Sequence, residues 1–116
     1  MEVSKELYRR ELLKGSTDTL LLSLLSEESM YGYKLVKEMD KRSSGYFQFK
    51  EGTLYPALHR LERDGMIQGS WGASPNGQNR RYYHITVKGR ARLESMLKEW
   101  NLFTKAVNLV AYPDTA

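Results

Sequence analysis

The sequence contains no cysteine, only two histidines and no long hydrophobic run. Without cysteine the protein can form no disulfide, no thiolate metal site and no cysteine nucleophile. The longest apolar run, Leu20 to Leu25, is too short to span a bilayer, and the first residues lack the basic and apolar pattern of a signal peptide. We therefore expect a soluble cytoplasmic protein that has no membrane partner.

The motifs of common enzyme classes are also missing. The two histidines, His59 and His84, belong to no HExxH sequence, and the chain has no Walker or GxGxxG loop. The serines fall in expected caps and turns rather than in a recognisable arrangement with a histidine. We therefore predict a protein that is not an enzyme and that uses no metal or other cofactor.

What the chain does contain is an ordinary globular composition with its positive charge in the middle. Its 116 residues are 41% hydrophobic and 28% charged, which suits one domain with a single core. Residues 30–92 hold twelve basic and five acidic residues, a net charge of +7, whereas both flanking segments are slightly acidic. A basic middle is expected if one face meets a polyanion, although a solvated surface rich in lysine and arginine would give the same charge.

The spacing of apolar residues predicts helices in the first half of the chain. Residues 3–14 form a short amphipathic helix, and the leucine-rich segment 20–25, preceded by the capping sequence Ser-Thr-Asp, forms a buried central one. Apolar residues within 32–39 and within 54–61 fall at i, i+3, i+4 and i+7, so each segment is predicted to be a helix. Residues 46–49 between them are expected to form a brief strand.

The second half changes to the alternation of strands. Residues 66–71 and 80–86 are predicted to form a hairpin around the polar loop 72–79, and Thr86 to cap a long last helix. That helix has a heptad-like seam made of Leu93, Met96, Trp100, Phe103, Val107 and Val110. A second apolar stripe lies beside the seam. We expect another copy of the chain to cover one stripe, and the alternative is a single-chain core that wraps the helix.

This order of elements predicts a mainly α fold with a small β-hairpin wing (α+β), namely a winged helix-turn-helix with an added helix at each end. Residues 1–15 would be an N-terminal helix that packs on the dimerisation helix, and residues 16–88 the DNA-binding domain. Residues 89–112 would be the C-terminal dimerisation helix, and residues 113–116 a tail.

Three stretches carry a recognisable pattern: residues 31–35 (YGYKL), 52–67 (GTLYPALHRLERDGMI) and 80–89 (RRYYHITVKG). In this order and spacing they resemble the phenolic-acid-decarboxylase regulator (PadR) family of bacterial transcriptional repressors, in the short form with one C-terminal helix. The resemblance implies a homodimer that binds palindromic operators in double-stranded DNA, often beside a detoxification or efflux gene. It also implies that the DNA is released when an effector binds.

The predicted helix at 54–61 supplies the candidate reading surface. Because its apolar side is expected to be buried, its opposite side should enter the major groove. The residues predicted to contact DNA here are Lys50, Thr53, Tyr55, Pro56, His59 and Arg63. Each has an ordinary alternative: Tyr55 can pack on the wing, for example, and Arg63 can pair with a neighbouring carboxylate.

The preceding helix and the residues at the base of the wing's turn are expected to add contacts to the DNA backbone. The candidates are Tyr33, Lys34, Lys37, Asn79, Arg80, Arg81 and Tyr82. For the helix residues the alternative is a solvated face. Since neighbouring strand residues point to opposite faces, at most one of the two arginines is expected to face DNA directly, unless a bulge or twist turns both toward it.

The candidate effector or dimer residues are Leu93, Met96, Trp100, Phe103 and Val107. A two-fold axis at the seam would bring Trp100 of one chain near Trp100 of the second chain. Two indoles in this arrangement can pack on each other or enclose a flat aromatic ligand. The family resemblance implies the second role, because a tryptophan at this position lines a drug-binding pore in short-form relatives. Structural packing is the alternative, and the charge of a ligand stays open.

Two other functions compete with this interpretation. A winged helix can be an interaction module that binds a protein partner and whose basic face is incidental. RNA binding would normally expose several stacking aromatics on one surface. The tyrosines that could serve it, which are not expected to gather in that way, are Tyr31, Tyr33, Tyr46, Tyr55 and Tyr82.

Overall fold

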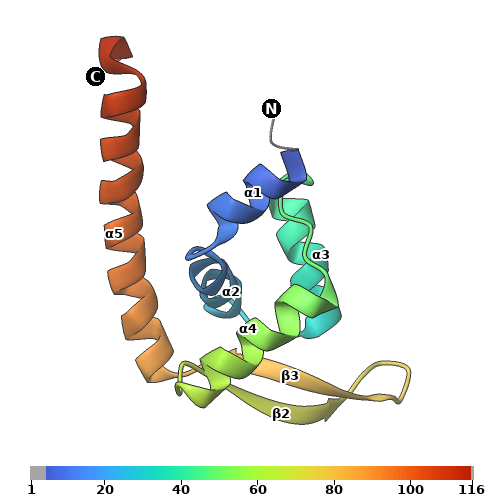
Figure 1. Cartoon of the computed structure of the whole chain (residues 1–116). Helices are drawn as coiled ribbons and strands as arrows, with labels where there is room; N and C mark the ends of the chain where they lie inside the picture. Colours follow the sequence, from blue (N-terminus) through green and yellow to red (C-terminus); the bar gives the residue numbers. More distant parts are fainter. Residues whose placement is uncertain (1–4, 116) are drawn as a thin grey trace.

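The computed structural model describes residues 5–115, in which helices predominate and three short strands form one antiparallel sheet (Figure 1). The elements in chain order are α1 (Lys5–Leu13), α2 (Thr17–Leu25), β1 (Met30–Tyr31), α3 (Gly32–Arg42), α4 (Glu51–Arg63), β2 (Ile67–Ala73), β3 (Asn79–Ile85), α5 (Val87–Ala111) and the short 3-10 helix η1 (Pro113–Thr115). This order confirms the predicted winged helix-turn-helix with an added helix at each end.

The core lies between α2, α3, α4 and the inner face of the sheet. Its most deeply buried large side chains are Leu21, Leu22, Leu25, Met30, Leu35, Leu54, Leu58 and Ile67. α2 is the central helix, as the sequence predicts, because it contacts α3, α4, α5 and β3. Burying a leucine contributes about 1.5–3 kcal/mol relative to leaving it exposed, so this cluster stabilises the whole domain.

The sheet has the order β1-β3-β2, which corrects one sequence prediction. β2 and β3 form the expected hairpin, but the third strand is β1, directly before α3, and not residues 46–49. That segment is an irregular connection held by side chains: Phe49 is buried in the core, and the hydroxyl of Ser43 accepts the backbone N–H of Phe47 at 2.8 Å. These anchors fix the segment without a strand partner.

The two predicted helix caps differ in outcome. The Thr86 hydroxyl accepts the backbone N–H of Gly89 at 3.0 Å and so caps α5 as expected. Ser16 precedes α2 but makes no side-chain cap. Its hydroxyl instead donates to the carbonyl of Leu13 at 3.0 Å, so it closes the end of α1. Ser16 therefore occupies the N-cap position of α2, as predicted, but the side-chain hydrogen bond expected of a cap is not made.

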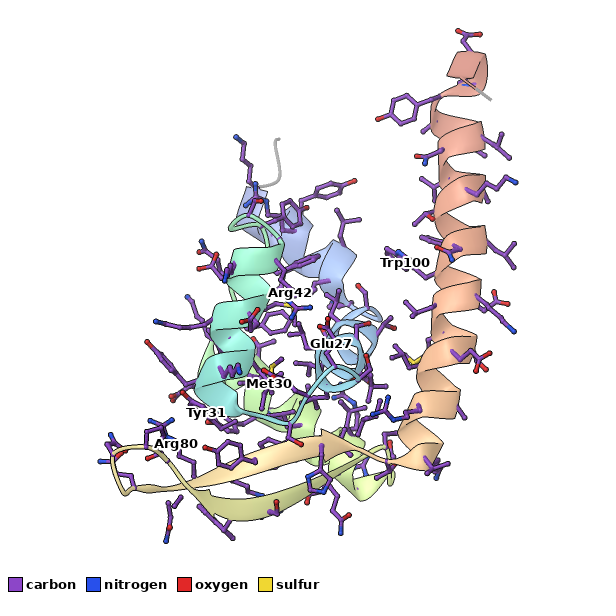
Figure 2. The ribbon with its side chains drawn as sticks, turned by 180° about the vertical axis from the view of Figure 1, so that it is seen from behind. Glu27, Met30, Tyr31, Arg42, Arg80 and Trp100 are labelled. Atoms are coloured by element: carbon purple, nitrogen blue, oxygen red, sulfur yellow. The ribbon has the colours of Figure 1, made fainter. Side chains whose placement is uncertain are left out.

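α5 extends away from the other elements, and its outer half stands apart from α1 in both views (Figures 1 and 2). The predicted packing of the N-terminal helix on the dimerisation helix is thus not made within one chain and stays a prediction for a two-chain assembly. Residues 1–4 and 116 of the predicted segments lie outside the described part. Among residues 5–115, no helix combines the length and the apolar character needed to cross a membrane.

Candidate nucleic-acid interface

α4 is the candidate recognition helix, the helix expected to enter the major groove, and one side of it faces solvent. Its buried side consists of Leu54, Ala57, Leu58 and Leu61. Because residues three or four apart share a helix face, the opposite side is centred on Gly52, Pro56, His59 and Arg63, which are all exposed. The Arg63 guanidinium lies 3.3 Å from the carboxylate of Asp64, a surface contact of little strength. His59 and Arg63 therefore offer hydrogen-bond donors at the centre of the exposed side.

Two other predicted contacts, Thr53 and Tyr55, lie on the two flanks of α4. On the Thr53 flank a shallow cavity separates α4 from the start of α2, and Arg60 there is paired with Asp18 at 2.7 Å. On the other flank, Tyr55 packs against Gly32 of α3, where an added Cβ would lie 2.5 Å from the Tyr55 hydroxyl. Tyr55 thus packs on α3, and it links the face of α4 to the start of α3.

The start of α4 has mixed electrostatics. Lys50 directly precedes the helix and its side chain is exposed. Its backbone carbonyl accepts a hydrogen bond from the backbone N–H of Leu54 at 2.9 Å. The free N–H groups of a helix N-terminus attract an anion, and the Lys50 side chain adds to this attraction. Glu51 in the first turn opposes it.

The two arginines that follow the turn of the wing point to opposite faces of β3, as predicted. Arg81 lies on the inner face, with its Nη2 atom 2.7 Å from the Glu62 carboxylate of α4. The same carboxylate accepts the backbone N–H of Gly69 at 3.0 Å, and the Arg81 guanidinium lies 5.9 Å from the ring centre of Trp71. Arg81 therefore fastens the wing to α4, and a carboxylate matches its charge.

Arg80 points away from Arg81 and lies beside Tyr31, close to the start of α3 (Figure 2). Its Cζ atom is 4.2 Å from the ring centre of Tyr31. Tyr82 meets the Tyr31 ring edge-on at 5.6 Å, and Tyr33 stacks beside it at 6.5 Å. The Nζ atom of Lys37 lies 5.0 Å from the ring centre of Tyr33. We call Tyr31, Tyr33 and Tyr82 the tyrosine cluster, which carries a cation at each end.

The tyrosine cluster corrects the expectation that the exposed tyrosines stay apart. Three of the five gather because β1 places Tyr31 beside β3, where it pairs with Tyr82. Sequence reasoning missed Tyr31 as a site residue because a two-residue strand has no alternating pattern. The available signal was the pair of tyrosines around Gly32 in the YGY motif.

Two of the four cations of α3 are paired with carboxylates. Lys34 bonds to Glu28, and this hydrogen bond raises the pKa of Lys34 and lowers the pKa of Glu28. Arg42 is paired with Glu27 in the same way (Figure 2). Lys37, in contrast, has no carboxylate partner among residues 5–115. A phosphate would therefore compete with Glu28 for Lys34 but not with a carboxylate for Lys37.

The tip of the wing is an ordered polar turn. Asn79 begins β3 opposite Ala73 and is exposed. The backbone N–H of Ser74 donates to the carbonyl of Gln78 at 2.8 Å, and its buried side chain bonds to Asn76. The turn carries no charged side chain, so the charge of the hairpin lies on Arg80 and Arg81, directly after the turn.

The predicted seam of α5 divides into a buried part and an exposed part. Leu93 is buried, and Met96 packs against the core. Trp100, Phe103 and Val107 are exposed, with 44% exposure for Trp100. The rings of Trp100 and Phe103 lie 5.9 Å apart, and Figure 2 shows Trp100 projecting toward the side on which α1 and α2 lie. The outer seam is thus an apolar face that this chain does not cover.

The fold and these surfaces define a winged helix-turn-helix protein. The model of the transcriptional regulator PadR-like family matches residues 21–95, and the chain belongs to this family. Membership confirms the resemblance seen in the sequence. The protein is therefore a transcriptional regulator and not an enzyme, as predicted.

Individual relatives agree with the family model. The chain is similar to a transcriptional regulator from Clostridium thermocellum of known structure, with 36% identity, a TM-score of 0.78 and coverage of 84% of this chain and 95% of that one. It is similar to the PadR-like transcriptional regulator from Bacillus cereus, with 34% identity, a TM-score of 0.78 and coverage of 88% and 97%. A transcriptional regulator of Mycobacterium tuberculosis is 32% identical over 84 residues, which are 72% of this chain and 75% of that protein.

Proposed function

We propose that the protein is a homodimeric, sequence-specific DNA-binding regulator that works in the bacterial cytoplasm. The observation that carries this proposal is a set of contacts that joins the exposed side of α4 to α3 and the wing. Tyr55 of α4 packs against Gly32 at the start of α3, and the exposed Lys37 of α3 lies over the Tyr33 ring. From Tyr33 the tyrosine cluster leads to Arg80 on the wing. Two copies of α4 would enter successive major grooves of a palindromic operator about one helical turn apart, with each wing on the flanking backbone.

The second copy of the chain would cover the outer half of α5. Leu102 and Phe103 are 62% and 60% exposed, and they share this helix with Trp100 and Val107. Contiguous exposed apolar side chains on this scale are typical of an interaction surface. A single-chain core that wraps the helix would require these side chains to be covered, which they are not.

We further propose that the protein represses a detoxification or efflux gene and responds to a flat aromatic effector held between two Trp100 side chains. The neighbouring rings of Trp100 and Phe103 support such a site. A ligand that tilts α5 would move α4, because the Thr86 hydroxyl at the start of α5 donates to the carbonyl of Gly65 at 2.7 Å. The spacing of the two recognition helices would change, and DNA binding would weaken.

Fluorescence anisotropy tests the DNA-binding proposal. The protein is titrated into its own upstream DNA, a scrambled duplex and an RNA hairpin at low and moderate salt, and a random-duplex selection covers a distant operator. If a dimer neutralises about six phosphates, its affinity should fall about 1000-fold between about 50 and 200 mM salt. Selection of no duplex sequence, or equal weak binding to all of them, would favour the protein-interaction module. Preference for the hairpin would favour RNA binding.

Tryptophan fluorescence tests the effector proposal. The chain has two tryptophans, so Trp71→Phe leaves Trp100 as the source of the tryptophan fluorescence. Planar aromatic compounds of both charges should quench Trp100 and release DNA over the same concentration range. Trp100→Ala should abolish release but retain the dimer. Quenching without release would contradict the proposed coupling.

A further inference from the structure

We infer that Tyr31 is a positioning residue for DNA binding, because its ring holds the Arg80 guanidinium, close to the turn of the wing, in the orientation that meets the DNA backbone. The inference rests on the proposed function. It adds a residue that lies outside the predicted DNA contacts, on a strand that the sequence did not reveal.

The contrast between the two wing arginines carries the inference. Arg81 is restrained by the Glu62 carboxylate, which also matches its charge. Arg80 has no ion pair with a carboxylate among residues 5–115, and its nearest aromatic partner is the Tyr31 ring at 4.2 Å. A guanidinium within about 6 Å of a ring centre is attracted to the ring face. Because the ring is neutral, it restrains Arg80 and leaves the full positive charge for a phosphate.

Tyr31 can hold Arg80 because Tyr31 is itself fixed on three sides. Its backbone pairs with Tyr82 in the sheet, and the Tyr82 ring meets its edge. Tyr82 in turn lies close above Gly72, where an added Cβ would be 3.1 Å from the ring. Tyr33 stacks beside Tyr31 at 6.5 Å. A long side chain restrained before binding loses less conformational entropy when it meets its target, which increases affinity.

A double-mutant cycle on the full-length dimer tests this role, with affinity measured by anisotropy on a duplex selected by the wild type. Tyr31→Leu removes the ring and should weaken binding about tenfold over the two copies. Arg80→Ala should weaken binding at least as much. The double variant should be no weaker than Arg80→Ala alone, because Tyr31 acts through Arg80. Tyr31→Phe, the matched control, retains the ring and should bind like the wild type.

The salt dependence separates positioning from a general loss of structure. Arg80→Ala should reduce the slope of log affinity against log salt by about 1 for each subunit, since one phosphate contact is lost. Tyr31→Leu should reduce the slope in the same direction. A variant that only destabilises the fold would lower the active fraction and leave the slope unchanged, which would overturn the inference.

The outcomes distinguish this inference from the proposed function. A wild-type protein that selects no duplex overturns the proposed function. If Tyr31→Leu binds DNA with wild-type affinity, the inference alone is overturned. It is also overturned if the double variant loses affinity by the product of the two single losses, because Tyr31 would then contact DNA itself. If Tyr31→Leu does not fold, the Nε–Hε NMR signal of Arg80, assigned with Arg80→Lys, gives the answer. It should be shifted upfield by the Tyr31 ring, and an unshifted signal overturns the inference.

Discussion

The exposure of apolar side chains differs between two regions of the molecule, the winged-helix body (residues 16–96) and the outer half of α5 (residues 97–111). In the body, Leu21 and Leu58 are 0% exposed, and the large apolar side chains around them are buried as well. In the outer half of α5, Phe103 is 60% exposed. The body therefore completes its core within one chain, whereas the outer half of α5 presents one half of an interface.

This difference separates two physical properties of the molecule. The free energy of unfolding depends on the body, whose core and ion pairs are all intramolecular. The oligomeric state depends on the outer half of α5. A substitution in one region should therefore change one property and leave the other, and the following changes are ordered by the size of their expected effect.

Leu58→Ala should have the largest effect, and on the folding of the body. Removing a fully buried leucine leaves a cavity and costs about 2–5 kcal/mol, a large part of the total stability of a small domain. Urea unfolding followed by circular dichroism measures the change. Val87→Ala, at a position that is 87% exposed, is the control and should stay within about 0.5 kcal/mol of the wild type. Equal stability of the two variants would contradict the distinction between body and surface.

Phe103→Asp should act on assembly instead. A carboxylate in an apolar dimer interface must be desolvated, so the dimer dissociation constant should rise about 100-fold or more, equivalent to about 2.7 kcal/mol. Sedimentation velocity measures the shift to monomer. Asn101→Asp places the same charge on the opposite side of α5 and should leave the dimer intact. Dissociation by both variants to the same degree would mean that the seam does not form the interface.

Glu62→Gln should have a smaller effect, confined to the wing. It removes the charge that holds Arg81, in a pair whose side chains are 34% and 30% exposed, so solvent screening limits the loss to about 1 kcal/mol. The new amide oxygen can still accept the N–H of Gly69. Hydrogen exchange should become faster in β2 and β3 and stay unchanged in α2. Glu94→Gln, which removes an exposed partner of Lys98, should change neither region.

Acidification should produce the smallest effect, at the surface pair of Glu28 and Lys34. The hydrogen bond from Lys34 lowers the pKa of Glu28 below its ordinary value of 4.5. The contribution of the pair to stability is therefore present above that value and is lost as the pH falls through the lower pKa of the folded state. In thermal unfolding, Glu28→Gln should be slightly less stable than the wild type at neutral pH, and the two should converge in acid. A stability difference between the two proteins that grows in acid would contradict this prediction.

The sequence predicts the elements whose signal is local and long. The helices at 32–42 and 51–63 follow from apolar residues in one stripe, and the hairpin follows from alternation in β2 and β3. β1 could not be predicted, because a two-residue strand is defined by its partner on β3. Residues 46–49 mimic a strand, since Phe47 and Phe49 alternate with polar residues, but both phenylalanines pack against the core without pairing.

At the candidate site, the sequence predicts which side of a strand a residue occupies, but it does not predict which residues pair. Strand alternation placed Arg80 and Arg81 on opposite faces. It did not say which arginine would meet a carboxylate, because that depends on where Glu62 of α4 crosses the sheet. Tyr31 was missed for the same reason, since its contact with Arg80 joins segments about 50 residues apart that only the tertiary fold brings together.

The stoichiometry of the protein–DNA complex tests most directly whether the body contacts DNA while α5 joins two copies. Native mass spectrometry of the wild type on a duplex selected from a random pool should show two chains per duplex. Phe103→Asp should retain a folded body and lose most of its affinity for that duplex. One chain per duplex, with Phe103→Asp binding as tightly as the wild type, would contradict this division between the body and α5.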